Sequence, residues 1–291
     1  MKKKLLAAVC AVSMMAIAMT GCGNKENEAA EPVGTVETEA TGDTKELSGT
    51  LTLAGSTSME KLCEAMSESF MEAYPDVTVT VEYTGSGAGI ESLISGSVDI
   101  GDSSRHVKED EMAKGAVENV VAIDGIAVIT DKENTVADIT SADLVKIYCG
   151  AVKNWKELGG QDEAIVVIGR EAGSGTRDAF EELLEVKDQC AYAQELDSTG
   201  AVLAKVASTP GAIGYVSLDV VDDTVNAVSI DSVEPTEEKI LAGNYLLSRP
   251  FVMATKGEIE EQSELVQEWF RYIKSEEGKA VIKTVGLIIP E

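Results

Sequence analysis

Histidine is almost absent from this 291-residue sequence, and its five cysteines form no closely spaced pair. The single histidine, His106, stands beside Lys108 and a run of acidic residues, a pattern typical of a solvated helix start. Zinc sites and disulfide frameworks need cysteines or histidines at short, regular spacings. We therefore expect no metal and no cofactor, and we expect Cys63, Cys149 and Cys190 to act as small apolar residues.

Basic residues are also scarce, with 24 Lys and Arg against 51 Asp and Glu and a formal net charge of −27. Proteins that bind nucleic acid need basic patches for the phosphate backbone, so the composition excludes nucleic acid as a partner. An acidic surface gives an anionic ligand no long-range attraction. If the ligand is an anion, donors inside the binding site must hold it.

Long apolar runs are missing except at residues 5–19, which follow three lysines. This run is shorter than the about 20 apolar residues of a membrane-spanning helix and predicts an export signal at residues 1–21. The residues before Cys22 resemble a bacterial lipobox, which predicts a lipidated Cys22; an ordinary cleaved signal with a chance cysteine is the alternative. Residues 22–48 are expected to form a flexible acidic tether. The protein would then sit on the extracytoplasmic face of the cell membrane, held by its lipid alone.

From residue 51 onward, strand-like and helix-like segments alternate along the chain. Apolar residues alternate with polar ones over residues 77–83, as in a half-buried strand. Over residues 59–70 they recur instead at the 3.6-residue spacing of a helix. The same alternation continues to the end of the chain, and it predicts the α/β fold class with mainly parallel strand pairing.

Four segments share one design: a strand end, a cluster of Gly with Ser or Thr, and usually a helix start. Glycine lets the backbone approach a ligand, hydroxyl groups donate hydrogen bonds, and a helix start offers free N–H groups with partial positive charge. In an α/β sheet, ligands bind outside the carboxyl ends of the strands, where these segments lie. Together with the planar cation of Arg170, they predict an oxyanion-binding site. The segments are residues 55–58, 85–89, 101–105 and 173–176.

The motifs at these strand ends are Ala54-Gly55-Ser56-Thr57-Ser58, Tyr83-Thr84-Gly85-Ser86-Gly87-Ala88-Gly89, Asp99-Ile100-Gly101-Asp102-Ser103-Ser104-Arg105 and Gly169-Arg170-Glu171-Ala172-Gly173-Ser174-Gly175-Thr176-Arg177. In order and spacing they resemble the phosphate-binding proteins of the Pst (phosphate-specific transport) ABC system. Asn154-Trp155 and Gly211-Ala212-Ile213-Gly214-Tyr215 look like further landmarks of that family. The resemblance covers residues 51–290.

The resemblance implies a two-lobed type II periplasmic-binding-protein fold with a hinge and a ligand cleft between the lobes. Residues 51–130 with 251–291 would form the first lobe, and residues 131–250 the second. It implies a monomer without enzymatic activity that captures inorganic phosphate and delivers it to the permease subunits of an ABC importer. Carried over position by position, its ligand contacts are Thr57, Ser58, Ser86, Ser104, Arg170, Ser174, Gly175 and Thr176.

Two positions depart from the family pattern. Ser104 stands where the best-known members carry an aspartate that accepts a hydrogen bond from protonated phosphate. Ala172 stands where they carry the aspartate that pairs with the arginine, so the partner of Arg170 stays open, with Glu171 adjacent. Asp102 and Arg105 are nearby candidates for altered roles, and Asp102 or a backbone carbonyl is expected to replace the missing acceptor.

Other functions remain open at this point. A binding protein for sulfate or molybdate would use the same donors. A serine hydrolase would need Ser174 with His106 and an acid, yet residues 172–176 do not form the Gly-x-Ser-x-Gly nucleophile elbow. No Walker A lysine follows the glycines, so NTP hydrolysis is disfavoured. Adhesion or signalling on the same fold is a further alternative.

Overall fold

The computed structural model describes residues 47–290. The predicted signal, the lipidated Cys22 and all but the last two positions of the predicted tether lie outside these residues. Within residues 47–290, every helix is too short or too polar to cross a membrane.

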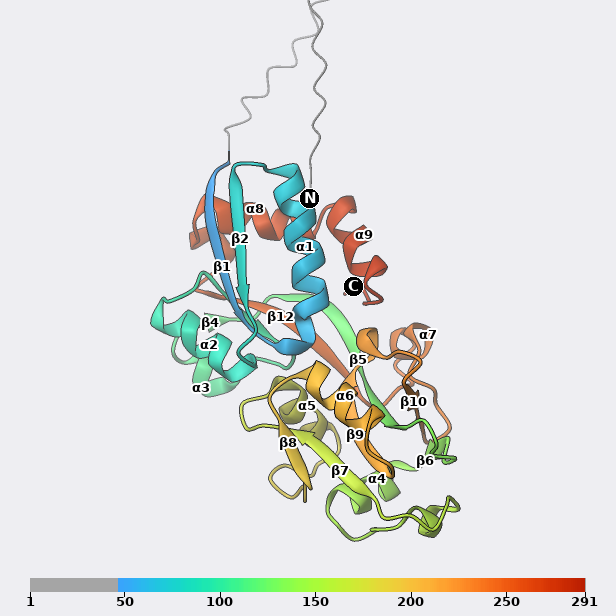
Figure 1. The fold of residues 1–291 in the computed structure, drawn as a ribbon. Coiled ribbons are helices and arrows are strands. Elements are labelled where there is room, and N and C mark those ends of the chain that lie inside the picture. The colour runs from blue at the N-terminus through green and yellow to red at the C-terminus, as the bar shows by residue number, and fades with distance from the viewer. Residues whose placement is uncertain (1–46, 291) are drawn as a thin grey trace, which may run out of the picture. The chain divides into compact units, whose positions relative to one another are not determined.

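The first strands of the chain form a parallel sheet covered by helices (Figure 1). β1 (Gly49–Gly55) pairs in parallel with β2 (Val77–Glu82) on one side and with β3 (Ile100–Ser103) on the other. α1 (Glu60–Ala73) connects β1 to β2, and α2 (Ser86–Ser95) connects β2 to β3. The helix and strand predicted from the apolar periodicity at residues 59–70 and 77–83 are thereby confirmed.

The end of the chain returns to these first strands. β12 (Ser248–Lys256) lies between β3 and the long strand β5 (Val120–Asp131) and runs antiparallel to both. α8 (Glu264–Ile273) and α9 (Glu276–Thr284) follow it. The expectation of mainly parallel pairing is therefore wrong for the middle of the sheet. β12 enters from the far end of the chain, and local sequence patterns carry no information on such distant pairing.

A second group of strands continues the sheet beyond β5 (Figure 1). β9 (Ala212–Ser217) pairs antiparallel with β5, and β7 (Val166–Arg170) pairs in parallel with β9 and with β8 (Gln194–Leu196). The helices of this part are α4 (Ser141–Tyr148), α5 (Gly175–Leu183) and α6 (Thr199–Ala207). The short elements of the fold are η1 (Thr57–Met59), α3 (Glu109–Met112), β4 (Ala116–Val117), β6 (Asp138–Ile139), η2 (Trp155–Leu158), η3 (Leu218–Val220), β10 (Val225–Ala227), β11 (Ser229–Ile230), α7 (Glu237–Leu241) and η4 (Ile259–Glu261).

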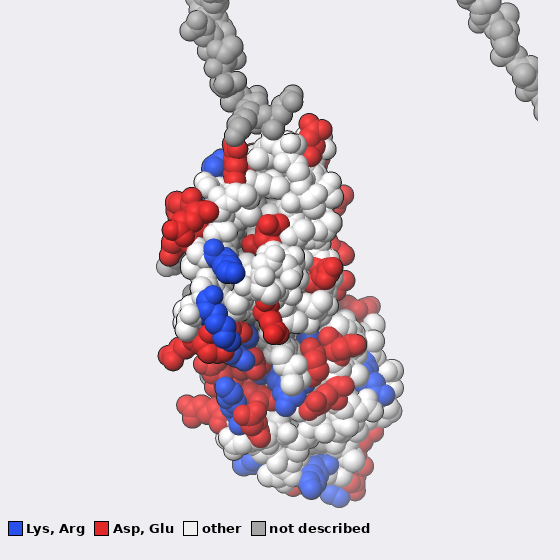
Figure 2. Space-filling view, turned by 90° about the vertical axis from the view of Figure 1, so that its left-hand side faces the viewer, with Lys and Arg blue, Asp and Glu red and all other residues white. Residues whose placement is uncertain are grey.

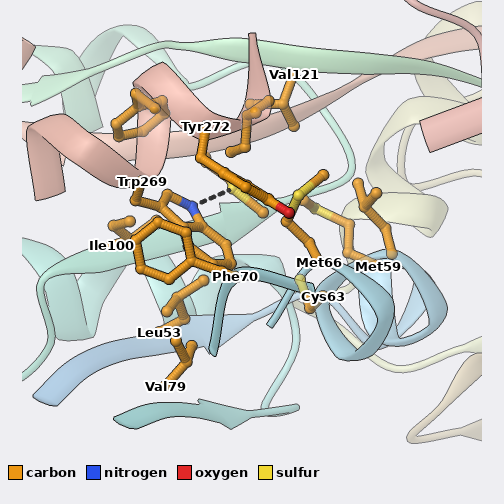
Figure 3. Packing of buried hydrophobic residues seen from close by; sticks show 14 of the residues in the cluster. Leu53, Met59, Cys63, Met66, Phe70, Val79, Ile100, Val121, Trp269 and Tyr272 are labelled. Carbon is orange, nitrogen blue, oxygen red and sulfur yellow. Dashed lines mark hydrogen bonds between the residues drawn. The ribbon is translucent and has the colours of Figure 1, made fainter. Parts of the chain in front are cut away.

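The first hydrophobic core joins the two ends of the chain. Figure 3 shows Phe70 of α1 packed against Trp269 of α8, with ring centroids 5.1 Å apart in an edge-to-face arrangement. The Trp269 Nε1–H group donates a hydrogen bond to the sulfur of Met253 on β12, at 3.2 Å. Buried aromatic rings remove large apolar areas from water, and an edge-to-face pair adds about 0.5–1.5 kcal/mol to that gain. This core therefore requires the C-terminal helices.

Separate hydrophobic cores lie around β7 and β9. β5 contributes to both sides of the molecule: Val121 and Ala122 belong to the first core, whereas Ile126 and Val128 belong to the second. At the other crossing, Leu247 belongs to the second core and Phe251 to the first. The chain thus forms two lobes, each with its own core, joined through β5 and β12. The exact lobe boundaries at residues 130 and 250 stay a prediction.

Asp102 on β3 is an acidic residue buried in the protein interior, with an exposed fraction of 1 %. The Cys63 thiol donates to its Oδ2 at 3.5 Å, and its Oδ1 has no hydrogen-bond partner within residues 47–290. Burial raises the pKa of Asp102 to about 8, against a smaller opposing effect of the Cys63 hydrogen bond. The carboxyl group is therefore mostly protonated at neutral pH.

This burial predicts how the stability of the protein changes with pH. A carboxyl group whose pKa is higher in the folded than in the unfolded state favours folding fully below about pH 4 and loses this effect as the pH rises toward 8. The free energy of unfolding of the wild type should therefore fall relative to Asp102→Asn by up to about 1.4 kcal/mol per pH unit in this window. Denaturant titrations of both proteins between pH 5 and 8 measure this, with Glu64→Gln on the exposed side of α1 as the control. Parallel pH profiles for wild type and Asp102→Asn would contradict the assignment.

Candidate functional site

The predicted ligand-binding residues follow four strand ends on the two lobes. Thr57 and Ser58 follow β1, Ser86 follows β2, and Ser104 follows β3. Arg170 ends β7, and the remaining three residues lie at the start of α5. All eight of these residues are buried: Thr57, Ser58, Ser86, Ser104, Arg170, Ser174, Gly175 and Thr176.

Hydroxyl groups from both lobes meet at this place. Ser58 Oγ of the first lobe lies 2.7 Å from Thr176 Oγ1 and 2.8 Å from Thr199 Oγ1 of the second lobe. Thr57 Oγ1 accepts a hydrogen bond from the backbone N–H of Thr199, at 3.2 Å. On the other side of the cluster, Ser86 Oγ lies 3.3 Å from Ser104 Oγ and accepts from the Ser104 N–H at 3.1 Å. The predicted residues are therefore one cluster, assembled across the two lobes.

Helix starts surround these hydroxyl groups. α2 begins at Ser86, α5 begins at Gly175 and α6 begins at Thr199, while η1 leads from Thr57 into α1. Ser174 is the N-cap of α5, and its side chain accepts from the Arg177 N–H at 3.3 Å. The first N–H groups of a helix have no partner inside the helix and carry partial positive charge. Four helix starts thus lie around one small region and add partial positive charge to it.

Two glycines permit this close approach. A Cβ atom on Gly175 would lie 2.2 Å from Ser86 Oγ and 2.8 Å from Ser104 Oγ, too close for any side chain. Gly85 precedes α2 with a φ of +89°, a left-handed conformation that L-residues with side chains rarely adopt. The glycines of these motifs therefore let the second lobe contact the first.

Arg170 is the cation of the cluster and is almost fully buried, with an exposed fraction of 2 %. Its Nε and Nη2 groups each donate to the Glu171 carboxylate at 3.0 Å. The carbonyl oxygens of Leu196 and Asp197 accept from the same edge of the guanidinium. Its Nη1 donates to Thr199 Oγ1 at 3.2 Å, so this edge faces the hydroxyl cluster. Glu171 is thus the partner of Arg170 that the sequence left open.

Thr199 is a residue of this cluster that the sequence analysis missed. It contacts Thr57, Ser58 and Arg170 from the first position of α6. Ser198 caps this helix by accepting from the Ala201 N–H. A signal was present, because Ser198-Thr199-Gly200 precedes an apolar helical stretch in the same way as the other motifs. Without a clear strand before it, the segment did not match the common design.

A second buried arginine, Arg249, contacts the backbone of the cluster. The sequence analysis missed this residue too. Arg249 of β12 donates from Nε and Nη2 to Asp124 Oδ2 of β5, at 2.9 and 2.8 Å. Its Nη1 donates to the carbonyl oxygen of Ser104 at 3.2 Å. Asp124 Oδ1 in turn accepts from the backbone N–H of Leu218 in the second lobe. Burial lowers the pKa of Arg249 and raises that of Asp124, while the attraction between the two charges opposes both shifts.

Asp219 lies beside this ion pair. Both of its carboxylate oxygens are buried without a hydrogen-bond partner in the described part of the chain. Burial, together with the neighbouring Asp124 carboxylate, raises the pKa of Asp219 to about 7. Its carbonyl oxygen accepts a hydrogen bond from Lys61 Nζ of α1 at 2.9 Å, which adds a contact between the lobes.

Asp102 and Arg105, the nearby candidates for altered roles, lie in different surroundings. The Asp102 side chain accepts from the Cys63 thiol in the first core, and it makes no hydrogen bond to the hydroxyl cluster. Arg105 pairs with Glu111 of α3 and with Asp178 of α5. His106 is exposed and contacts Glu118, while Ser174 serves as a helix cap. The arrangement of Ser174 with His106 that a serine hydrolase would need is not formed.

The outer surface offers little attraction to an anion. Figure 2 shows acidic side chains spread over the visible face, with basic side chains interspersed among them and no continuous basic patch. Among residues 47–290, no group of three or more His, Cys, Asp or Glu side chains could hold a metal ion. An anion would therefore be held by hydroxyl groups, helix starts and Arg170.

Comparisons with known proteins agree with this geometry. Residues 35–277 match the family model of the PBP superfamily domain. The chain is 37 % identical over 291 residues to the phosphate-binding protein PstS of Bacillus subtilis, covering 99 % of this chain and 94 % of that protein. It is 28 % identical over 250 residues to PstS of Borreliella burgdorferi, covering 82 % of this chain and 89 % of that protein.

Solved structures show the same fold. A candidate phosphate ABC transporter substrate-binding protein of Clostridium perfringens, solved with bound phosphate, has a TM-score of 0.81 and 40 % identity, covering 84 % of this chain and all of that one. An ABC-type phosphate transport receptor of Vibrio cholerae has a TM-score of 0.70 and 33 % identity, covering 83 % of this chain and all of that one. The chain therefore belongs to the PBP superfamily and, within it, to the PstS phosphate-binding proteins.

Proposed function

We propose that this protein captures inorganic phosphate outside the cytoplasm and delivers it to the permease subunits of an ABC importer. The observation that carries the proposal is the buried cluster of hydroxyl groups and helix starts around Arg170, drawn from both lobes. The relative that is 37 % identical is named a phosphate-binding protein, and the one that is 40 % identical is a candidate substrate-binding protein of a phosphate ABC transporter, solved with bound phosphate. The protein binds and releases its ligand and is not an enzyme.

The chemistry of the cluster fits a tetrahedral oxyanion. Such an anion has four oxygens that point in different directions, and donors approach this site from four strand ends. Neutral donors can hold a dehydrated anion because each hydrogen bond to a charged group contributes more than one between neutral groups. Arg170 adds one positive charge, and Glu171 fixes the guanidinium so that its Nη1 edge faces the cluster.

The connection of the lobes supports capture by closure. Thr57, Ser58 and Ser86 come from the first lobe, and Thr176 and Arg170 come from the second. The site is complete only when the lobes are together. β5 and β12 cross between the lobes and would act as the hinge, so closing around the anion assembles the donors and excludes water.

Selectivity for phosphate over sulfate is the sharpest test of the ligand. Phosphate carries one or two protons near neutral pH, and a site that offers an acceptor gives these protons a partner, whereas sulfate has none to donate. Because the Asp102 side chain contacts Cys63 and no hydroxyl group of the cluster, we propose that a hydroxyl or carbonyl oxygen of the cluster accepts. We expect phosphate to bind at least about 100-fold more tightly than sulfate or molybdate, or about 2.7 kcal/mol. Competition calorimetry at neutral pH measures this, and equal affinities would reduce the function to general oxyanion binding.

Arg170→Ala tests the role of the buried cation. Removing a charge-assisted contact to a dehydrated anion should weaken phosphate binding by at least about 30-fold, or about 2 kcal/mol. The variant also leaves Glu171 without its cation, which adds to the loss. Arg271→Ala, on the exposed face of α8, is the matched control and should bind as the wild type does. An affinity of Arg170→Ala within threefold of the wild type would refute the role of Arg170.

Cys22 is the residue from which we infer the location of the protein in the cell. We propose that Cys22 is lipidated and that the lipid holds the protein, as a monomer, on the extracytoplasmic face of the membrane. The support for this is the lipobox-like sequence before Cys22.

Cys22→Ser should release the protein from the membrane fraction into the medium or periplasm, because the lipid would be its single anchor. Fractionation and immunoblotting of cells that express wild type and variant measure the release. Retention of Cys22→Ser at the wild-type level would show that another feature holds the protein.

A further inference from the structure

Arg105 is a buried side chain held in one position at the end of β3. Its Nη1 and Nη2 donate to the two oxygens of Glu111 at 2.9 and 2.8 Å, and Nη1 also donates to the carbonyl oxygen of His106 at 2.8 Å. Its side chain is 4 % exposed. These contacts all lie within the first lobe, so they fix the guanidinium whether the lobes are together or apart. The remaining Nε–H group is directed at a different partner.

That partner is Asp178, on the second lobe. Arg105 Nε donates to Asp178 Oδ2 at 2.9 Å, and Lys108 Nζ lies 2.7 Å from the same oxygen. Asp178 is in the first turn of α5, two residues after Thr176 of the hydroxyl cluster. Arg105 likewise follows Ser104 directly. The ion pairs thus connect the segments that carry the site on either lobe.

We propose that Arg105, Lys108 and Asp178 form a latch between the lobes that sets how long the closed, anion-bound form lasts. This rests on the proposed function, because it assumes that the lobes close around the anion. The side chains of the latch pair with one another and with Glu111, not with the hydroxyl cluster, so the latch acts by positioning the two lobes. Neither Asp178 nor Lys108 belongs to the hydroxyl cluster.

The kinetic consequence follows from when the contacts form. Arg105 and Asp178 can meet only after the lobes have closed, so their attraction slows opening and does not affect the first encounter with the anion. Most differences in affinity among variants of one interface likewise arise in the dissociation rate. The Asp178 side chain is 23 % exposed, and a groove of about 330 Å³ lined by Arg105, Lys108, Asp178 and Glu182 runs beside it. Dissolved ions therefore have access to the ion pair of Arg105 with Asp178 and screen its attraction.

Asp178→Asn tests the latch because it removes the charge and keeps the shape. Its release of ³³P-labelled phosphate, chased with unlabelled phosphate, should be at least about tenfold faster than that of the wild type, at an association rate within twofold. Raising the salt from about 50 to 500 mM should speed release from the wild type and leave the variant nearly unaffected. Lys108→Met should give a smaller acceleration, because its side chain is 43 % exposed.

Asp143→Asn is the matched control, because Asp143 also stands in the first turn of a second-lobe helix and pairs with a lysine, Lys146, of its own helix. It should change neither rate. Melting temperatures of all variants separate loss of folding from loss of the latch. A wild-type release rate in Asp178→Asn would overturn the latch and leave phosphate capture intact. Failure of the wild type itself to bind labelled phosphate would overturn the proposed function.

Discussion

The ion pair between Arg249 and Asp124 is the interaction on which the rest of the molecule depends. It joins neighbouring positions of β12 and β5, where β5 contributes to both cores and β12 follows Leu247 of the second core into the first. Arg249 donates a hydrogen bond to the carbonyl oxygen of Ser104 in the first lobe. Asp124 accepts one from the backbone N–H of Leu218 in the second lobe. Replacing one partner would leave a buried charge unpaired, which costs about 3–5 kcal/mol. The pair therefore fixes the connection about which the lobes move.

Apart from this ion pair, the contacts between the lobes are individual polar interactions. Ser58 with Thr176, Lys61 with the Asp219 carbonyl, and Arg105 with Asp178 are hydrogen bonds or ion pairs. The hydrophobic cores, in contrast, lie almost entirely within one lobe each, with Ile288 of the C-terminal segment the exception that joins the second core. Opening the lobes would therefore expose groups that water can satisfy, at little cost in apolar area. With such an arrangement, binding of the anion can shift the equilibrium from the open to the closed form.

Local sequence patterns predicted the four strand-end segments that the structure brings together, and the resemblance to the Pst family supplied the eight ligand-binding candidates within them. They succeeded because a strand end followed by Gly, Ser or Thr and a helix start is a local feature. They failed where the decisive partner is distant in sequence. Asp124 and Arg249 are 125 residues apart, and each alone is a single charge in an apolar strand. The antiparallel place of β12 and the contact of Thr199 with Ser58 depend likewise on the whole fold.

The position of β12 has a consequence for biosynthesis. β12 lies between β3 and β5 in the sheet, although it is made about 120 residues after β5. The second lobe needs little beyond residue 247, so it can fold while the ribosome is still adding the last residues. Until then the inner edge of β3 has unpaired N–H and C=O groups, and the first core lacks Trp269. The lobe that begins the chain is thus the last to be completed, and a nascent chain is most exposed to aggregation just before β12 emerges.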